Sequence, residues 1–324
     1  MTQTLEVSGL RTHFFTRDGV VKAVDGVDFS VGKGEVMGLV GESGSGKSIT
    51  GFSIIGLIDS PGRIVEGSIK FNGTELANAP EDDLRRLRGN KIAMIFQDPM
   101  MTLNPVLRID TQMIEAIEAH RKVEKRVAWE RARDTLGMVG IPSPEERLRA
   151  YPHQLSGGMR QRVAIAIAFL NEPDLIIADE PTTALDVTIQ AQIIYEAQSL
   201  CKRTGTSLIW ITHDLAVVAG LADRISVMYA GRIVEQGGTD DVIDRPVHPY
   251  TVGLLGSVPS SNNRGQRLNQ ITGMTPNMLA LPKGCAFAAR CPRKSDVCAS
   301  EPQITLDHGR AFRCFHPHIE AFAS

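Results

Sequence analysis

Short apolar runs and longer amphipathic segments alternate along most of the chain. The runs that predict strands are residues 5–7, 27–31, 36–40, 64–71, 92–96, 175–178, 207–211 and 225–228. The segments that predict helices are residues 49–57, 111–139, 159–170, 188–202 and 215–221. Continuous apolar runs such as 175–178 are typical of central strands in a parallel sheet. Strands that alternate with helices in this way predict an α/β fold with a parallel sheet.

The pattern changes twice along the chain. Between about residues 98 and 160 it is mainly helical and charged, which predicts a helical insertion in the α/β pattern. From Pro246 onward Pro, Gly, Asn and Cys are frequent and periodicity is weak. We therefore predict a main domain over residues 1–245, with a helical subdomain at about 98–160, and a loop-rich C-terminal extension over residues 246–324.

The composition argues against several classes of protein. The 324 residues include 35 Lys and Arg against 37 Asp and Glu, so a net charge of −2 gives no electrostatic case for nucleic-acid binding. Residues 1–6 lack a basic and then apolar leader, and the longest apolar runs are too short to cross a bilayer. We expect a cytosolic protein that reaches a membrane only through a partner. In that reducing compartment, the five cysteines are not expected to form structural disulfides.

The most informative motif is Gly-Glu-Ser-Gly-Ser-Gly-Lys-Ser at residues 41–48, which fits G-x-x-x-x-G-K-[ST], the phosphate-binding loop of P-loop nucleoside triphosphatases. Its glycines let the backbone curl so that successive N–H groups point at phosphate oxygens. Lys47 is expected to reach the β- and γ-phosphates, and Ser48 to ligate Mg²⁺. A predicted strand precedes the loop, and the dipole of the predicted helix that follows favours phosphate. The predicted nucleotide-binding residues of this loop are Gly41, Ser43, Gly44, Ser45, Gly46, Lys47 and Ser48.

Two further segments supply groups that nucleotide hydrolysis needs. The apolar run 175–178 ends in Asp179 and Glu180. Asp179 is expected to hold Mg²⁺ through water, and Glu180 is the candidate base that polarises the attacking water. Without the loop upstream, the same acids would fit two solvated groups at a strand end. Residues Ser156, Gly157 and Gly158 begin a predicted helix and offer N–H donors and a hydroxyl to an anion.

In combination, these motifs resemble those of the ATP-binding subunits of ABC transporters. Residues 155–161 resemble that family's signature motif, although Met159 stands where the family commonly has Gln. Residues 184–186 resemble its D-loop, with Asp186 at the dimer interface. In this family two domains bind ATP head to tail, so that each signature motif serves the partner's phosphate-binding loop. The resemblance covers about residues 5–245 and implies a P-loop NTPase fold with a RecA-like parallel sheet core, an antiparallel β subdomain and a helical insertion.

The resemblance also implies roles for residues whose local context alone says little. Gln97 follows a predicted strand and is expected to contact Mg²⁺ and sense the membrane subunit. His213, also after a predicted strand, is expected to contact the γ-phosphate. Phe14 is the expected adenine-stacking residue, with Phe15 as the alternative.

The match narrows over four segments that closely resemble the dipeptide and oligopeptide importer ATPases: residues 96–105, 151–155, 184–190 and 245–251. This resemblance implies an ATP hydrolase that energises a peptide importer from the cytoplasmic face of the bacterial inner membrane, as a peripheral protein. It implies a second ATPase subunit in a heterodimer, two transmembrane permease subunits and a periplasmic or extracellular substrate-binding protein as partners. Nucleic acid is not expected as a partner.

Three alternatives stay open. Related importer ATPases move nickel, glutathione or oligosaccharides, and the substrate cannot be read from this chain. A soluble ABC-type ATPase acting on nucleic acid or ribosomes is disfavoured, because the chain has one cassette and no heptad run. A module that binds ATP without hydrolysing it is disfavoured by the intact Glu180 and His213.

Four cysteines gather near the C-terminus, and we call them the tail cysteines: Cys285, Cys291, Cys298 and Cys314. Four thiolates can hold a [4Fe–4S] cluster or a tetrahedral Zn²⁺. The C-x5-C-x6-C-x15-C spacing lacks the C-x2-C pairs that zinc sites usually show, and the resemblance to peptide importers favours iron and sulfide. We expect a structural staple, because the extension holds few apolar residues; four unliganded thiols are the remaining alternative. Cys201 is expected to be a buried apolar residue.

Overall fold

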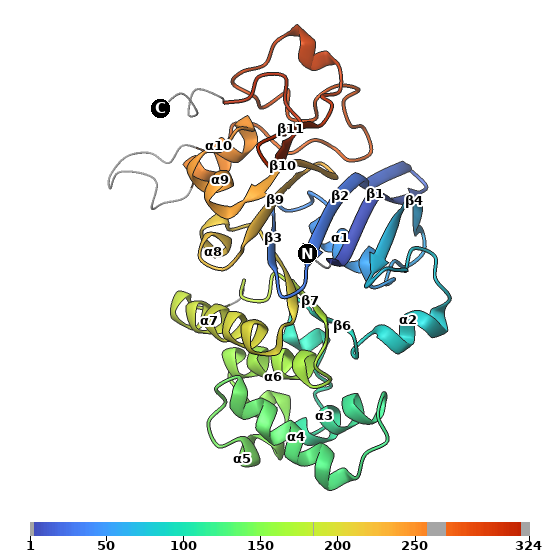
Figure 1. The fold of residues 1–324 in the computed structure, drawn as a ribbon, viewed down its shortest axis with the longest axis vertical. Helices are drawn as coiled ribbons and strands as arrows, with labels where there is room; N and C mark the ends of the chain where they lie inside the picture. The colour runs from blue at the N-terminus through green and yellow to red at the C-terminus, as the bar shows by residue number, and fades with distance from the viewer. Residues whose placement is uncertain (1–2, 184, 258–269, 319–324) are drawn as a thin grey trace. The chain divides into compact units, whose positions relative to one another are not determined.

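The computed structural model describes residues 3–183, 185–257 and 270–318 (Figure 1). Ala184, part of the predicted D-loop, lies outside the described residues. Contacts within the chain divide it into two compact units. The helical unit comprises residues 1–4, 31–35 and 79–209, and the sheet unit comprises residues 5–30, 36–78 and 210–324. The domain boundary at residue 245 stays a prediction.

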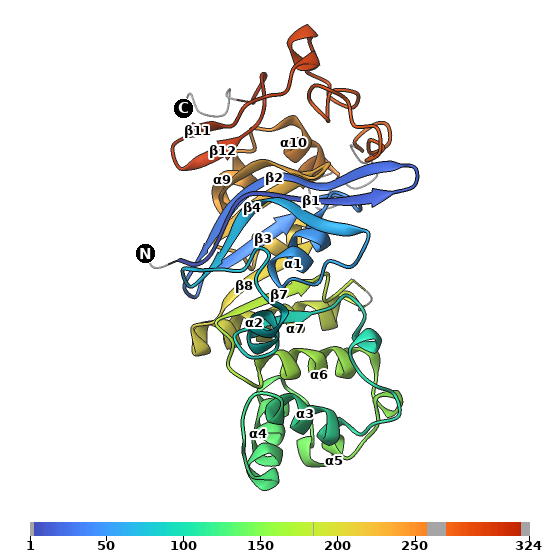
Figure 2. The same cartoon turned by 90° about the vertical axis from the view of Figure 1, so that its right-hand side faces the viewer.

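The sheet unit contains strands of two sheets. The first sheet has the order β2 (Gly19–Gly32), β1 (Gln3–Thr16), β4 (Gly62–Phe71) and β5 (Thr74–Glu75). In it β1, β4 and β5 pair antiparallel, and Figure 2 shows β2, β1 and β4 side by side. The strands of the second sheet that lie in this unit are, in order, β11 (Thr305–Asp307), β12 (Arg310–Phe312), β10 (Arg232–Gly238), β9 (Arg224–Tyr229) and β3 (Val36–Val40). Only the β3–β9 pair among them is parallel.

The strand β3 is apolar along its whole length because both of its faces are covered. All five of its residues are buried, as expected for a central parallel strand. A Cβ at Gly38 would lie 2.9 Å from Val218 of α8 (Leu215–Ala219), so this glycine lets the helix pack closely on the strand. The other helices that the structure describes in this unit are α1 (Lys47–Ile54), α9 (Thr239–Asp244), α10 (Pro249–Gly256) and the 3-10 helix η4 (Asp296–Ala299).

In its described residues the helical unit holds the strands β6 and β7, part of β8, and most of the helices. Its strands have the order β8 (Ser207–Thr212), β7 (Leu175–Asp179) and β6 (Ile92–Ile95), and β8 crosses the division between the units. The strands β6 and β7 pair in parallel. Its helices are α2 (Glu81–Leu87), α3 (Ile109–Glu118), α4 (Lys125–Met138), α5 (Pro144–Leu148), α6 (Gly157–Phe169), α7 (Val187–Thr204) and the 3-10 helices η1 (Pro99–Met101) and η2 (Pro152–Gln154).

The predicted helical segment 111–139 contains two helices, α3 and α4, which pack with α5 and α6 (Figure 1). Buried residues four apart form an apolar stripe on α3 that ends at Ile117. Helical spacing would place Arg121 next on this stripe. The Arg121 guanidinium instead donates to the Asn171 carbonyl at 3.1 Å, outside the helix. The first helix therefore ends where the apolar stripe ends.

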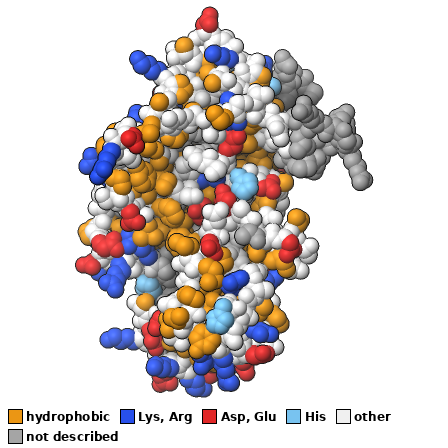
Figure 3. Space-filling model, turned by 180° about the vertical axis from the view of Figure 1, so that it is seen from behind, with side chains coloured by type: hydrophobic (Ala, Val, Ile, Leu, Met, Phe, Trp, Pro, Cys, Tyr) orange, Lys and Arg blue, Asp and Glu red, His pale blue; other side chains and the backbone are white. Residues whose placement is uncertain are grey.

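The architecture confirms the predicted α/β class, with parallel strands, an antiparallel sheet and a helical insertion. None of the helices formed by the described residues is long and apolar enough to cross a bilayer. Figure 3 shows Lys and Arg side chains interspersed with Asp and Glu side chains over one face of the described residues. This mixing matches the nearly balanced charge of the sequence.

His248 begins α10 and is almost fully buried. Its backbone N–H donates to Glu235 Oε2 at 2.8 Å, and its Nδ1 accepts a hydrogen bond from the Tyr250 N–H at 3.0 Å. The imidazole thus caps the helix. Burial lowers the pKa of His248 to about 3, so the ring is neutral in the folded protein at neutral pH.

This buried histidine predicts acid sensitivity. The unfolded chain takes up a proton near the ordinary His pKa of 6.5, whereas the folded chain does so only near about 3, so the free energy of unfolding falls as the pH drops between these values. The loss is at most about 1.4 kcal/mol per pH unit. In His248→Asn the side-chain oxygen can keep the cap without taking up a proton, and we expect a shallower decline. Urea unfolding of both proteins over this pH range measures the difference; parallel declines would contradict the assignment.

Candidate functional site

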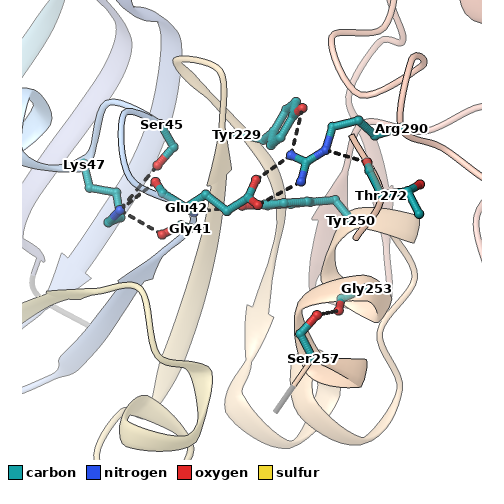
Figure 4. Close-up of polar contacts among 10 residues, drawn as sticks. All are labelled: Gly41, Glu42, Ser45, Lys47, Tyr229, Tyr250, Gly253, Ser257, Thr272 and Arg290. Atoms are coloured by element: carbon teal, nitrogen blue, oxygen red, sulfur yellow. Dashed lines mark hydrogen bonds and ion pairs between the residues drawn. The ribbon is translucent and has the colours of Figure 1, made fainter. Parts of the chain in front are cut away.

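The phosphate-binding loop at residues 41–48 connects β3 to α1, as predicted (Figure 4). Two of its glycines have no space for a side chain. A Cβ at Gly41 would lie 2.9 Å from Ser45 Oγ and closer still to the Met228 carbonyl oxygen. Gly46 has a φ of 104°, and a Cβ there would lie 2.8 Å from Met228 Cε and closer still to the Ala23 carbonyl oxygen. Neighbouring backbone therefore dictates glycine at both positions.

Lys47 is the first residue of α1 and is buried, with 4% of its surface exposed. Its Nζ donates to the carbonyl oxygens of Gly41 at 2.8 Å and Glu42 at 3.0 Å (Figure 4). The Ser45 carbonyl in turn accepts a hydrogen bond from the Gly231 N–H at 2.9 Å. The ammonium group is thus held over the inside of the loop, where it can exchange carbonyl oxygens for phosphate oxygens.

The two candidate adenine-stacking residues lie near the end of β1 in different surroundings. The ring of Phe14 is half-buried and packs on the backbone of Gly62. A Cβ at Gly62 would lie only 2.6 Å from Phe14 Cε1, so a side chain at residue 62 would clash with this ring. The Phe15 ring is exposed and lies beneath the Arg63 guanidinium, 4.4 Å from the ring centroid. Neither contact decides between them, so Phe14 stays the predicted residue.

In the helical unit, the two acids after β7 differ in their surroundings. Asp179 is the last residue of β7 and is buried. Glu180 follows with a φ of 45°, in the left-handed region that non-glycine residues seldom adopt. One oxygen of its carboxylate, Oε2, accepts hydrogen bonds from Thr183 Oγ1 at 3.0 Å and from Gln97 Nε2 at 3.5 Å. Such strain persists at functional sites when the surrounding structure fixes it.

The structure therefore brings Gln97 and Glu180 together. Gln97 follows β6 and Glu180 follows β7. These strands pair in parallel, with Ile95 opposite Ala178, so the residues after their carboxyl ends meet at one edge of the sheet. This edge is where ligands bind in parallel α/β sheets.

The predicted signature residues lie at the beginning of α6 in the same unit. Ser156 is the N-cap, and its hydroxyl accepts a hydrogen bond from the Met159 N–H at 3.3 Å. A Cβ at Gly158 would lie 3.0 Å from Ile189 Cγ2 of α7, so the first turns of the two helices approach closely. Asp186 caps α7 by accepting from the Ile189 N–H at 3.0 Å. Gly157 is the first residue of α6 and lies between the N-cap Ser156 and Gly158.

His213 lies in the sheet unit, directly after β8, and is exposed. The next residue, Asp214, caps α8 by accepting from the Ala216 N–H at 2.8 Å. The predicted site residues thus divide between the units. Those of the sheet unit are Phe14, Gly41, Ser43, Gly44, Ser45, Gly46, Lys47, Ser48 and His213. Those of the helical unit are Gln97, Ser156, Gly157, Gly158, Asp179, Glu180 and Asp186.

The tail cysteines are free thiols with unequal exposure. Among the described residues, no group of three or more His, Cys, Asp or Glu side chains is gathered closely enough to hold a metal ion. The pKa of the Cys314 thiol is raised to about 11, mainly by burial; the hydrogen bond from the His316 N–H opposes this rise, and the other three tail cysteines add to it. The Cys285 N–H donates to the Cys298 carbonyl at 3.0 Å, so the backbones of these two tail cysteines lie side by side.

Backbone donors also point at these sulfurs. The sulfurs of Cys291 and Cys314 accept hydrogen bonds from backbone N–H groups two residues later, at 3.4 Å and 3.3 Å. Burial raises the pKa of the Cys285 thiol, and the Phe287 N–H, two residues later, opposes this rise. Such N–H donors stabilise a thiolate, so the donor set fits a thiolate-bound metal in its chemistry. Cys201 is buried as predicted, and burial raises its pKa to about 12.

Three contributors to the loop were not predicted from the sequence: Glu42, Tyr250 and Arg290. The Glu42 N–H donates to the Tyr250 hydroxyl at 2.8 Å, and its carboxylate is bound by Arg290 (Figure 4). Glu42 stands inside the motif, at a position where the pattern allows any residue. Arg290 lies between Cys285 and Cys291 in the sequence, and the cysteine pattern indicates no role for this arginine. Only the fold brings these distant residues together.

Comparison with known proteins places this geometry in a family. The chain is 50% identical to the oligopeptide transport ATP-binding protein AppD of Bacillus subtilis, over 97% of each chain. It is 49% identical to OppD of Escherichia coli, over 97% of this chain and 93% of that one. The chain belongs to the family of oligopeptide and dipeptide transport ATP-binding proteins. The resemblance drawn from the sequence motifs is confirmed.

Two family models match the cassette region and the C-terminal region of the chain, and solved structures match most of its length. Residues 24–183 match the ABC transporter family, and residues 234–298 match the oligopeptide/dipeptide transporter C-terminal region. Among solved structures, a dimeric post-hydrolysis state of the ATP-binding cassette MJ0796, bound to ADP and Pi, has a TM-score of 0.66 at 27% identity. It covers 72% of this chain and 98% of its own. The predicted ABC nucleotide-binding fold is confirmed.

Proposed function

We propose that this chain is the ATP-hydrolysing subunit of an ABC importer for dipeptides or oligopeptides, bound peripherally at the cytoplasmic face of the membrane. The observation that carries the proposal is the extent of similarity to peptide-transport ATP-binding proteins. It reaches 97% of the chain and includes the C-terminal region as well as the cassette. A cassette match alone would support an ABC ATPase without indicating its cargo.

The proposed chemistry combines a lysine that binds phosphate, a glutamate that acts as base and oxygen ligands for Mg²⁺. Lys47 neutralises charge on the β- and γ-phosphates, and Glu180 orients and polarises the attacking water. We assign His213 to the γ-phosphate and Phe14 to the adenine ring. Ser48, Gln97 and, through water, Asp179 offer the oxygen ligands that Mg²⁺ prefers, and the bound ion would offset phosphate charge.

The proposed cycle depends on pairing with a second ATP-binding subunit. Ser156, Gly157 and Gly158 would complete the partner's nucleotide site through the N–H groups at the start of α6. ATP binds the closed pair better than the open pair and so shifts the population toward closure. Closure moves two permease subunits, to which a separate binding protein delivers the peptide. We propose a heterodimer, with Asp186 at the interface.

The variant Glu180→Gln tests the hydrolysis step. The amide cannot act as a base, so we expect ATP turnover to fall by about a hundredfold or more, while an ATP-bound dimer persists. Phosphate release measures turnover, and light scattering during size exclusion measures the dimer. Glu172→Gln is the matched control, because Glu172 is another left-handed glutamate of the same unit, at φ 52°, without an assigned role.

Parental turnover in Glu180→Gln would contradict the base assignment. The same trapped variant, isolated from bacterial membranes with ATP, also tests the transport assignment. We expect two permease subunits to co-purify with it. Ribosomal proteins in their place would contradict import.

We further propose that the tail cysteines hold a [4Fe–4S] cluster that staples the C-terminal extension. The support is chemical: four thiols in one short tail, a backbone hydrogen bond between Cys285 and Cys298, and backbone N–H donors on the sulfurs of Cys291 and Cys314. In the described residues the thiols are too far apart to bind one metal site together. Binding of the cluster would therefore have to bring the four sulfurs closer to one another. Its role is structural in this proposal.

Metal analysis of protein purified without oxygen tests the cluster. We expect about four iron and four sulfide per chain, with broad visible absorption from thiolate-bound iron. Cys201→Ser should keep the full content, because Cys201 is buried in α7, away from the tail sequence. Cys291→Ser should lose it. One zinc per chain, or no metal in protected protein, would contradict the iron–sulfur assignment.

A further inference from the structure

Glu42 uses all of its polar groups to fix the phosphate-binding loop. Its carbonyl oxygen accepts from Lys47 Nζ at 3.0 Å, and its N–H donates to the Tyr250 hydroxyl at 2.8 Å. Its carboxylate accepts two hydrogen bonds from Arg290, at 2.6 and 2.9 Å (Figure 4). The position of this one residue therefore decides where a carbonyl partner of the catalytic lysine lies.

Arg290 comes from the C-terminal extension, one residue before Cys291. Only 5% of its side chain is exposed. Its Nε donates to the Thr272 carbonyl at 3.1 Å, and its Nη1 also lies 3.4 Å from the Tyr229 hydroxyl. The guanidinium is flanked by the rings of Tyr229 and Phe287, at 5.9 and 6.0 Å from their centroids. These contacts hold the plane of the Arg290 guanidinium independently of Glu42. A guanidinium held in this way is suited to donate two parallel hydrogen bonds to a carboxylate.

The ion pair between Arg290 and Glu42 has an electrostatic effect as well as a structural one, because Glu42 carries a negative charge. A carboxylate within a loop that binds a polyanion repels the phosphates unless a cation neutralises it. The Glu42 side chain is only 28% exposed, so water screens it incompletely. Arg290 supplies the opposite charge at hydrogen-bonding distance and draws the carboxylate toward the extension.

We infer that Arg290 is a positioning residue for nucleotide binding, which sets the loop through Glu42 and cancels the charge of that residue. The C-terminal extension then contributes directly to ATP affinity. This inference rests on the proposed ATP-binding function and adds to it a residue outside the cassette motifs.

ATP affinity of the full chain, measured by displacement of a fluorescent ATP analogue with Mg²⁺ present, tests the inference. In Arg290→Gln the Glu42 carboxylate is left without its cation, and we expect the Kd for ATP to rise about fivefold or more. In Arg290→Gln/Glu42→Gln the uncompensated charge is removed as well. We expect that double variant to return to within about twofold of the parental Kd, because coupled residues are not additive.

The matched control is Arg313→Gln. Arg313 is another largely buried arginine of the extension, and its ion-pair partner is Asp28 of β2, at 3.8 Å. It should change the thermal unfolding midpoint without changing the Kd for ATP. A general loss of stability in the extension would instead weaken ATP binding in this control and in Arg290→Gln alike, and Glu42→Gln would not rescue it.

Parental affinity in Arg290→Gln would overturn the inference. A double variant that binds as weakly as Arg290→Gln would overturn the charge-cancelling role, since only the uncompensated charge has been removed in it. Should Arg290→Gln fail to fold, Arg290→Lys carries the test, because it keeps the charge but cannot reproduce the planar two-bond contact. We expect a smaller rise in Kd there, and parental affinity would overturn the positioning role. If the parental chain itself does not bind ATP, the proposed function fails; if it binds and the variants match it, only this inference fails.

Discussion

The shape of the phosphate-binding loop depends on backbone carbonyls that occupy the space where side chains of Gly41 and Gly46 would lie. The carbonyl of Met228 stands at the first position, and that of Ala23 stands at the second. Because these groups belong to strands, the loop inherits its curvature from the sheets around it. Lys47 is buried at the end of this loop, and we propose that the loop already has its nucleotide-binding shape before any nucleotide arrives.

Contacts from distant parts of the sequence hold this loop within the sheet unit. Gly231 donates to the Ser45 carbonyl, the Tyr250 hydroxyl accepts from Glu42, and Arg290 binds the Glu42 carboxylate. Two of these partners lie beyond the cassette motifs. The C-terminal extension therefore contacts the predicted phosphate-binding loop through Arg290.

Local patterns predicted much of the fold and the candidate site. The loop at 41–48 and the acids after β7 were found because their spacing is set by one strand end and one turn. The strand β1 was underestimated, at residues 5–7 rather than Gln3–Thr16, because charged residues such as Arg11 interrupt its apolar pattern. Arg11 pairs with the buried Asp25 in the fold, and sequence patterns do not reveal such a partner.

Other features depend on contacts that no local pattern encodes. The ion pair of Glu42 with Arg290 joins residues 248 positions apart. The left-handed backbone of Glu180 likewise has no signature in its side chain.

The most direct test of the preformed site is a structure of the full chain with a non-hydrolysable ATP analogue and Mg²⁺. We predict that Lys47 Nζ leaves the carbonyls of Gly41 and Glu42 for phosphate oxygens while the loop backbone keeps its shape. A loop that refolds around the nucleotide, or an analogue bound elsewhere, would contradict it.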